Sequence, residues 1–178
     1  SVTNAGAVNI LYGSATGLAT AGNETWTQDS TGVEDAAEAG DRFGYALKAG
    51  DFNRDGRADL AVGAPYESVG ALVEAAAVNV LYGAVGGLTR ANDELWHQGI
   101  AGVEGGAEAD DWFGWRLTAG DFNGDGRADL AVGVPHEDVG AIANAGAVNV
   151  LYGAASGLTA TGDQIWDQDS SGIQETAE

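Results

Sequence analysis

Two segments of the sequence place acidic and amide side chains at the spacing of a metal-binding loop. Residues 51–59 read Asp-Phe-Asn-Arg-Asp-Gly-Arg-Ala-Asp, and residues 121–129 differ only in having glycine as the fourth residue. Oxygen ligands at loop positions 1, 3 and 5, a glycine at 6, a backbone carbonyl at 7 and a carboxylate at 9 form the front of a calcium-binding loop. The predicted ligands are Asp51, Asn53, Asp55, Arg57 (backbone carbonyl) and Asp59 in the first loop, and Asp121, Asn123, Asp125, Arg127 (backbone carbonyl) and Asp129 in the second.

The chemistry of these loops favours a divalent cation. Alternate side chains converge on one point, while Gly56 or Gly126 lets the backbone turn around the ion. Carboxylates this close together repel one another, and a bound Ca²⁺ removes that cost. An EF-hand carries a bidentate glutamate at position 12, but Val62 and Val132 stand there in this chain. We therefore expect two weak Ca²⁺ sites, with dissociation constants of about 10⁻⁴ to 10⁻³ M. The alternative is a pair of metal-free turns, because Asp, Asn and Gly favour turns in any case.

Composition excludes several other kinds of chemistry. The 178 residues include 27 Asp and Glu but only 7 Lys and Arg, which gives a formal net charge of −20. Such a chain lacks the basic patch that neutralises nucleic-acid phosphates, and it is equally unsuited to an anionic membrane surface. Without cysteine there is no thiolate nucleophile and no cysteine-ligated zinc. The two histidines, His97 and His136, do not follow the repeat described below, and no serine or aspartate is placed to form a triad with them. We expect no catalytic residues, no organic cofactor and no membrane insertion.

The elements that carry the loops belong to a repeat with a period of 70 residues. The segment Ala-Gly-Ala-Val-Asn-Ile-Leu-Tyr-Gly at residues 5–13 recurs in nearly the same form at residues 75–83 and 145–153. Glycine supplies 29 of the 178 residues, which disfavours long helices. Within each repeat, alternating apolar and polar residues bounded by glycine-rich turns predict four short strands. We therefore expect an all-β chain in which each repeat is one blade of four antiparallel strands, as in a β-propeller.

The phase of the repeat predicts two and a half blades. Residues 1–38 carry only the third and fourth strands of a blade, residues 39–108 form a full blade with loop 51–59, and residues 109–178 form a full blade with loop 121–129. Because propellers need about 4 to 8 blades to close, we expect the chain to be a piece of a longer propeller. A homo-oligomer is the alternative, and whether another chain completes the half blade stays open at this point.

These residues resemble the FG-GAP repeat found in the propellers of integrin α-chains and related extracellular proteins. The resemblance rests on Phe43-Gly44, loop 51–59 and Val62-Gly-Ala-Pro65, and it is repeated at Phe113-Gly114, loop 121–129 and Gly133-Val134-Pro135. It implies Ca²⁺ at the loop between the first two strands of each blade, held by the residues given above. It also implies seven blades, and this chain departs from that number. The similarity of the repeats to each other looks most like the bacterial secreted branch of the family.

Other periodic residues have a structural interpretation and a functional one. Trp26, Trp96 and Trp166 share the 70-residue period, so we expect them to pack between blades, although an exposed indole could also stack on a sugar. Glu67 and Glu137 follow each proline by two residues, and we expect them to hold the turn through hydrogen bonds rather than to bind a ligand. Residues 111–116 hold two tryptophans and a phenylalanine, which makes this stretch the best candidate for a ligand site in a single blade.

The function that fits these features best is a non-catalytic, calcium-stabilised extracellular module for protein or carbohydrate recognition and adhesion, either secreted or at the cell surface. A lectin with sugar sites between blades is one alternative. An accessory propeller of a secreted enzyme is another. The protein or glycan ligand cannot be chosen from sequence, because fold does not determine function.

Overall fold

The structure is a computed structural model that describes residues 2–174 and 177. Within these residues all regular secondary structure is β, which confirms the predicted fold class. No helix long and apolar enough to cross a membrane occurs in this part of the chain. The strands are β1 (Val8–Ser14), β2 (Gly17–Trp26), β3 (Ala46–Gly50), β4 (Asp59–Ala64), β5 (Ala77–Leu81), β6 (Gly83–Ala84), β7 (Gly87–Leu88), β8 (Glu94–Trp96), β9 (Arg116–Gly120), β10 (Asp129–Val134), β11 (Ala147–Ala154) and β12 (Gly157–Trp166).

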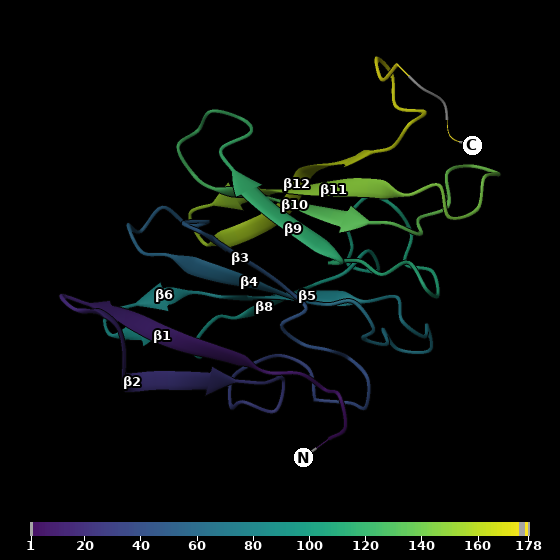
Figure 1. The fold of residues 1–178 in the computed structure, drawn as a ribbon. Coiled ribbons are helices and arrows are strands. Elements are labelled where there is room, and N and C mark those ends of the chain that lie inside the picture. The colour runs from purple at the N-terminus through teal and green to yellow at the C-terminus, as the bar shows by residue number, and fades with distance from the viewer. Residues whose placement is uncertain (1, 175–176, 178) are drawn as a thin grey trace.

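Two four-stranded antiparallel sheets form the centre of the molecule (Figure 1). Their strand orders are β3-β4-β5-β8 and β9-β10-β11-β12, so each sheet is an up-and-down meander of sequential strands. The registers agree between the sheets: Leu60 pairs with Leu81 in the first, and Leu130 pairs with Leu151 in the second. This arrangement confirms the predicted blade of four antiparallel strands. We call the two sheets with their loops the middle blade and the C-terminal blade.

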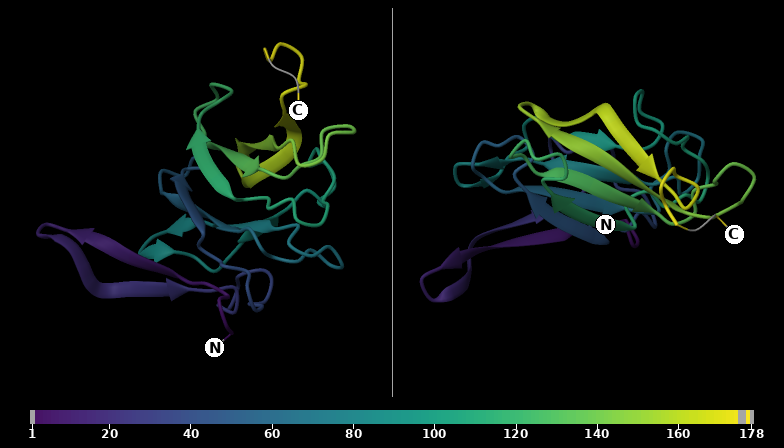
Figure 2. Two further views of the ribbon diagram at one scale, coloured as in Figure 1. Left: turned by 45° about the vertical axis from the view of Figure 1, so that its right-hand side comes forward. Right: turned by 90° about the horizontal axis from the view of Figure 1, so that it is seen from above.

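The third unit is the hairpin β1-β2, which forms a separate two-stranded sheet beside the middle blade (Figure 2). It corresponds to the third and fourth strands of a blade, since the pairing of Val8 with Trp26 repeats the pairing of Val78 with Trp96. We call it the half blade. The limits of the three units at residues 38 and 108 stay predictions.

Each Phe-Gly pair packs a full blade against the unit that precedes it in the chain. Phe43 and Phe113 are 2% and 0% exposed, and they belong to the apolar clusters between neighbouring sheets. Gly44 and Gly114 have φ values of 92° and 88°, a region that favours glycine. A Cβ on Gly114 would lie only 2.7 Å from Val78 Cγ2, so a larger residue would separate the two blades.

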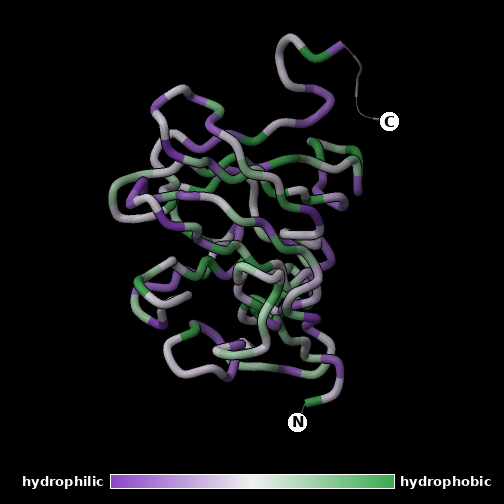
Figure 3. The backbone as a smooth tube through the Cα atoms, turned by 60° about the vertical axis from the view of Figure 1, so that its left-hand side comes forward, coloured by the Kyte–Doolittle hydropathy of each residue, from purple (hydrophilic) through white to green (hydrophobic). Residues whose placement is uncertain are grey.

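The apolar core therefore lies between sheets rather than inside one continuous layer. One cluster joins the middle and C-terminal blades and includes Phe52, Val80, Trp96, Leu130 and Leu151. A smaller cluster joins the half blade to the middle blade. Hydrophobic and hydrophilic residues are interspersed along the chain through the stacked sheets (Figure 3). β5 is buried at every position, because Val78 and Val80 pack in one cluster and Leu81 packs in the other.

Candidate metal centre

Both predicted metal loops connect the first two strands of a blade. Loop 51–59 joins β3 to β4, and loop 121–129 joins β9 to β10. The loops lie against each other across the junction of the two blades, because Arg54 Nη1 donates to the backbone carbonyl of Asp125 at 3.0 Å. The repeat thus places two chemically similar loops at the same end of adjacent sheets.

In each loop, side-chain oxygens accept hydrogen bonds from backbone N–H groups of the same loop. In the first loop Asp51 accepts hydrogen bonds from the backbone N–H groups of Asp55 and Gly56, both at 3.0 Å. Asn53 Oδ1 also accepts from Asp55 N at 3.0 Å, and Asp55 Oδ1 accepts from Arg57 N at 2.9 Å. Gly56 has a φ of 85°, which supplies the turn predicted for loop position 6.

The second loop repeats this pattern almost bond for bond. Asp121 accepts from the N–H groups of Asp125 and Gly126 at 3.0 and 2.9 Å, and Asn123 accepts from Asp125 N at 2.9 Å. Gly126 has a φ of 83°. The two loops therefore adopt one conformation, which follows from their nearly identical sequences.

The last carboxylate of each loop has a different role from the others. Asp59 is 1% exposed, and its two oxygens accept from the backbone N–H groups of Phe52 at 2.8 Å and Gly83 at 2.9 Å. Asp129 is fully buried and makes the same two bonds, to Phe122 and Gly153. Burial raises the pKa of Asp59 above its usual range, while the two backbone donors act against that rise. Through these hydrogen bonds the last aspartate of each loop holds the loop against the end of the third strand of the blade.

The donor set of the loops fits calcium chemically, because it contains only carboxylate, amide and carbonyl oxygens. Asp55 and Asp125 each also contact the arginine two residues on, at 3.3 and 3.0 Å. The backbone hydrogen bond from Arg127 is the main cause of a lowered pKa at Asp125, which favours the ionised form of this carboxylate. The three loop carboxylates do not form a tight cluster among the described residues, since the triad whose oxygens all lie within 4.8 Å lies elsewhere. The assignment of the individual ligands stays a prediction.

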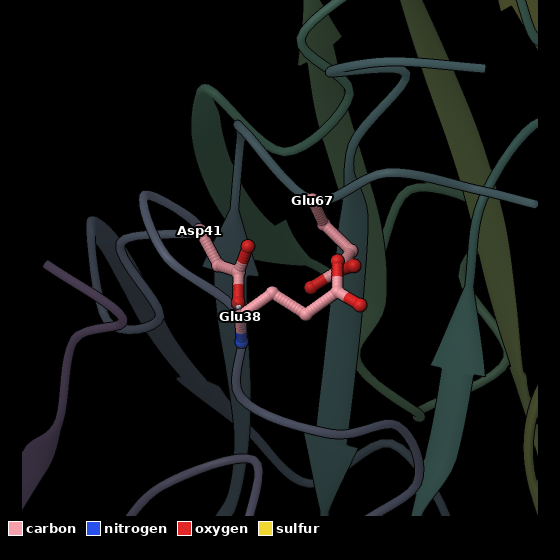
Figure 4. Close-up of side chains that lie close together, drawn as sticks. All are labelled: Glu38, Asp41 and Glu67. Atoms are coloured by element: carbon pink, nitrogen blue, oxygen red, sulfur yellow. Dashed lines mark hydrogen bonds between the residues drawn. The ribbon is translucent and has the colours of Figure 1, made fainter. Parts of the chain in front are cut away.

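That tight triad consists of Glu38, Asp41 and Glu67 (Figure 4). Sequence reasoning had singled out Glu67 alone, and the expected hydrogen bonds are confirmed: its carboxylate accepts from Gln28 Nε2 at 2.6 Å and from Ser68 N at 3.0 Å. Asp41 was missed, although it recurs as an aspartate 70 residues later. Glu67 is 1% exposed, and burial raises its pKa to about 7, with smaller contributions from Asp41 and other acids.

The C-terminal blade repeats the buried glutamate. Gln98 Nε2 donates to Glu137 Oε2 at 2.5 Å, and burial again raises the glutamate pKa to about 7. The Oε1 atoms of Gln28 and Gln98 are buried without a partner among the described residues. Turning either amide over would let this oxygen accept the proton of a neutral glutamic acid. The structure is thus suited to protonated glutamates at these two positions.

The raised pKa values predict that Glu67 and Glu137 contribute less to stability as the pH rises from about 4.5 to about 7. In the folded state the two glutamates hold their protons up to about pH 7. In the unfolded chain the same glutamates have the ordinary pKa of 4.5 and release their protons at lower pH. This contribution is fully present below about pH 4.5 and is lost as the pH rises to 7. We expect Glu67→Gln to raise the thermal midpoint by about 2–4 °C at pH 8 and to leave it nearly unchanged at pH 5. Glu24→Gln, at a half-exposed carboxylate, serves as control, and an equal gain at both pH values would contradict this interpretation.

A cluster of aromatic side chains lies outside the two metal loops, where other loops of the middle blade and the C-terminal blade meet. Trp112 and Trp115 stack with ring centroids 5.0 Å apart, and Tyr45 lies 4.6 Å from Trp115. Tyr66 and His136 complete the cluster at 5.5 and 3.9 Å from Trp112. We call these five residues the aromatic cluster. It contains the two tryptophans of the stretch 111–116 that the sequence indicated, and it adds three rings contributed by other turns.

The periodic tryptophans pack as expected at two of their three positions. Trp26 and Trp96 are 1% and 9% exposed and belong to the clusters between sheets. Trp166 is 41% exposed, because the described residues place no further sheet against the C-terminal blade. Its exposure follows from its place in the array, so it is weak support for a sugar site.

The fold and the repeated loops define a β-propeller module built from tandem blades. A family profile described as "FG-GAP repeat" matches residues 43–79 and 113–151. These two segments of the chain are therefore FG-GAP repeats.

Several curated proteins are similar to this chain over most of its length. Phosphatidylinositol-glycan-specific phospholipase D of Mus musculus is 36% identical over 124 residues, which is 70% of this chain and 14% of that protein. Integrin alpha-7 of Homo sapiens is 33% identical over 138 residues, covering 74% of this chain and 10% of the integrin. Integrin alpha-6 of Gallus gallus is 29% identical over 133 residues, covering 73% and 11%. The chain thus spans between a tenth and a seventh of the length of these relatives.

Proposed function

We propose that the chain is a calcium-stabilised, non-catalytic propeller module that works outside the cell in the recognition of a protein or carbohydrate. The observation that carries the proposal is the pair of loops 51–59 and 121–129, which present the same oxygen donors in the same conformation. Asp51, Asn53, Asp55, the Arg57 carbonyl and Asp59 would hold the first ion, and their partners 70 residues on would hold the second. The ions would neutralise clustered carboxylates and so stabilise the fold.

The extracellular assignment follows from the expected affinity. A site that binds Ca²⁺ at about 10⁻⁴ to 10⁻³ M is filled by the millimolar calcium of an extracellular fluid and stays empty in a cytosol. The net charge of −20 also suits a calcium-rich exterior. The names of the relatives, integrin alpha chains and a phospholipase D, agree with this setting only as an analogy. The enzyme activity in the phospholipase name is not proposed for this chain, because the chain covers only 14% of that protein.

A lectin-type function is the second candidate, and the aromatic cluster favours it. Pyranose rings stack on exposed aromatic faces, and Tyr45 is 37% exposed beside Trp115. Arg42 lies over the Tyr66 ring at 4.4 Å and Arg116 over the Trp115 ring at 5.3 Å, which adds charged hydrogen-bond donors at the rim.

The third candidate, an accessory propeller of a secreted enzyme, requires a catalytic domain in the parent polypeptide, and sequencing the gene of that polypeptide tests it.

The recognition function is tested by immobilising the chain in 2 mM calcium and probing it with pyranose oligosaccharides and with extracellular-matrix proteins. We expect at least one panel to give saturable binding. If the aromatic cluster is the site, Trp115→Ala weakens binding about tenfold or more, in line with the loss of an aromatic anchor, while Trp166→Ala at the open sheet does not. Binding to neither panel, in chain shown to be folded, would contradict the proposed function.

A further inference from the structure

One side chain of the first metal loop, that of Arg54, reaches the second metal loop. Its Nη1 atom donates a hydrogen bond to the backbone carbonyl of Asp125 at 3.0 Å. A Cβ on Gly126 would meet the Arg54 Cζ atom at 3.0 Å and both terminal guanidinium nitrogens at 3.2 Å. The guanidinium therefore lies directly against the backbone of the fifth and sixth positions of loop 121–129.

This arginine stands at the one position where the sequences of the two loops differ. The fourth residue is Arg54 in the first loop and Gly124 in the second. Both residues have positive φ values, 60° and 79°, in a region that glycine adopts freely and other residues adopt rarely. Glycine would thus suit the backbone of the first loop at least as well as arginine does. A long side chain held in an unfavourable backbone conformation indicates a role for the side chain itself.

The guanidinium brings a positive charge to residues of the second predicted ion site. Asp125 is one of the predicted ligands, and its side chain also contacts Arg127 Nη1 at 3.0 Å. Asp125 and Gly126 are exposed, so the contact with Arg54 is open to water and salt. Exposed charges still act on each other within a Debye length, which is about 8 Å at physiological ionic strength. The contact distances of Arg54 to the second loop are well below this limit.

We propose that Arg54 determines the affinity of the second calcium site: its positive charge, held on loop 121–129 by the hydrogen bond to Asp125, weakens the binding of Ca²⁺ there. The inference rests on the proposed function, because it requires that the loops bind calcium. Arg54 blocks no predicted ligand atom of Asp125, since it bonds to the main-chain carbonyl and the predicted ligand is the side chain. A residue of one loop thus sets the calcium concentration at which the next loop fills.

The test is a calcium titration of the full chain, labelled with nitrogen-15 and followed by NMR at the amides of Gly56 and Gly126. Each of these amides donates to the first aspartate of its own loop, so the two signals report separately on the two sites. We expect Arg54→Gln to lower the calcium concentration at the Gly126 midpoint by about threefold to tenfold, because it removes one unit charge beside an exposed site for a divalent ion. The Gly56 midpoint should change less than about twofold, since the guanidinium lies on the other loop.

Two further variants separate the charge of Arg54 from its hydrogen bond. Arg54→Lys keeps the charge but loses the planar guanidinium, so its Gly126 midpoint should stay within about twofold of that of the parent chain. Arg90→Gln removes an exposed positive charge outside both loops and should leave the Gly126 midpoint unchanged. Equal effects of the glutamine and lysine substitutions at position 54 would overturn the proposal, because they would show that the hydrogen bond acts and the charge does not.

Salt provides a readout that a purely structural role would not change. When KCl is raised from about 50 mM to about 500 mM, screening should reduce by at least half the ratio of the Gly126 midpoints of the parent chain and Arg54→Gln. A ratio that does not depend on salt would overturn the proposal. If neither amide of the folded chain responds to calcium, the proposed calcium function fails, and the role of Arg54 fails with it. If both amides respond but Arg54→Gln leaves the Gly126 midpoint unchanged, only the role of Arg54 is overturned.

Discussion

Phe52→Ala is expected to lower the free energy of unfolding by about 3–5 kcal/mol, the usual cost of truncating a buried phenylalanine. The residue is 0% exposed between the two full blades, so its removal leaves a cavity lined by Leu130 and Leu151. The loop backbone is retained, because the Asp59 bond involves only the N–H group of residue 52. Urea unfolding followed by tryptophan fluorescence measures the change.

Phe122→Ala is the matched control for this experiment. Phe122 stands at the same position of the second loop but is 51% exposed, so we expect a loss below about 1 kcal/mol. Similar losses for both variants would contradict the assignment of Phe52 as the side chain that joins the two blades. A large loss at position 122 alone would mean that a neighbouring molecule covers it in solution.

The second large effect is expected from the metal loops. With a dissociation constant of about 0.1 mM, 1 mM calcium stabilises the fold by about 1.4 kcal/mol per site. Asp55→Ala combined with Asp125→Ala should therefore lose about 3 kcal/mol in calcium. In EDTA the loss should be small, because both side chains are exposed and their arginine contacts are worth little.

Asp110→Asn controls for the removal of negative charge, since it changes an exposed acid outside the loops. We expect it to leave the calcium response unchanged. The comparison is made by thermal unfolding of the three proteins in 1 mM calcium and in EDTA. Equal destabilisation of the loop variant in both conditions would show that the two aspartates act only as turn residues.

The repeat made most of the fold predictable. Alternation around Val78 and Val80, together with the 70-residue period, predicted strands and a four-stranded blade, and the structure has both. The position of the metal loops between the first two strands also followed from the sequence. The strand alternation, the period and the loop motif are all local or periodic patterns, so that a single sequence is enough to reveal them.

Contacts between blades could not be predicted in the same way. Phe52 and Phe122 have identical neighbours in sequence, yet one is buried and the other is half-exposed. The difference arises from the next blade, which is far away along the chain. The approach of Asp41 to Glu67 and the assembly of the aromatic cluster from separate turns are of the same kind. The 70-residue period indicates which residues are equivalent. The burial of each residue depends on whether a neighbouring blade packs against it.

Thermal unfolding of the full chain in EDTA, in magnesium and in calcium tests most directly whether calcium stabilises this propeller module. Calcium is titrated from micromolar to millimolar concentrations at constant ionic strength. We predict a rise in the midpoint that is specific to calcium, develops at about 0.1–1 mM and fits two sites. The same midpoint in all three conditions, or an equal rise with magnesium, would contradict the claim.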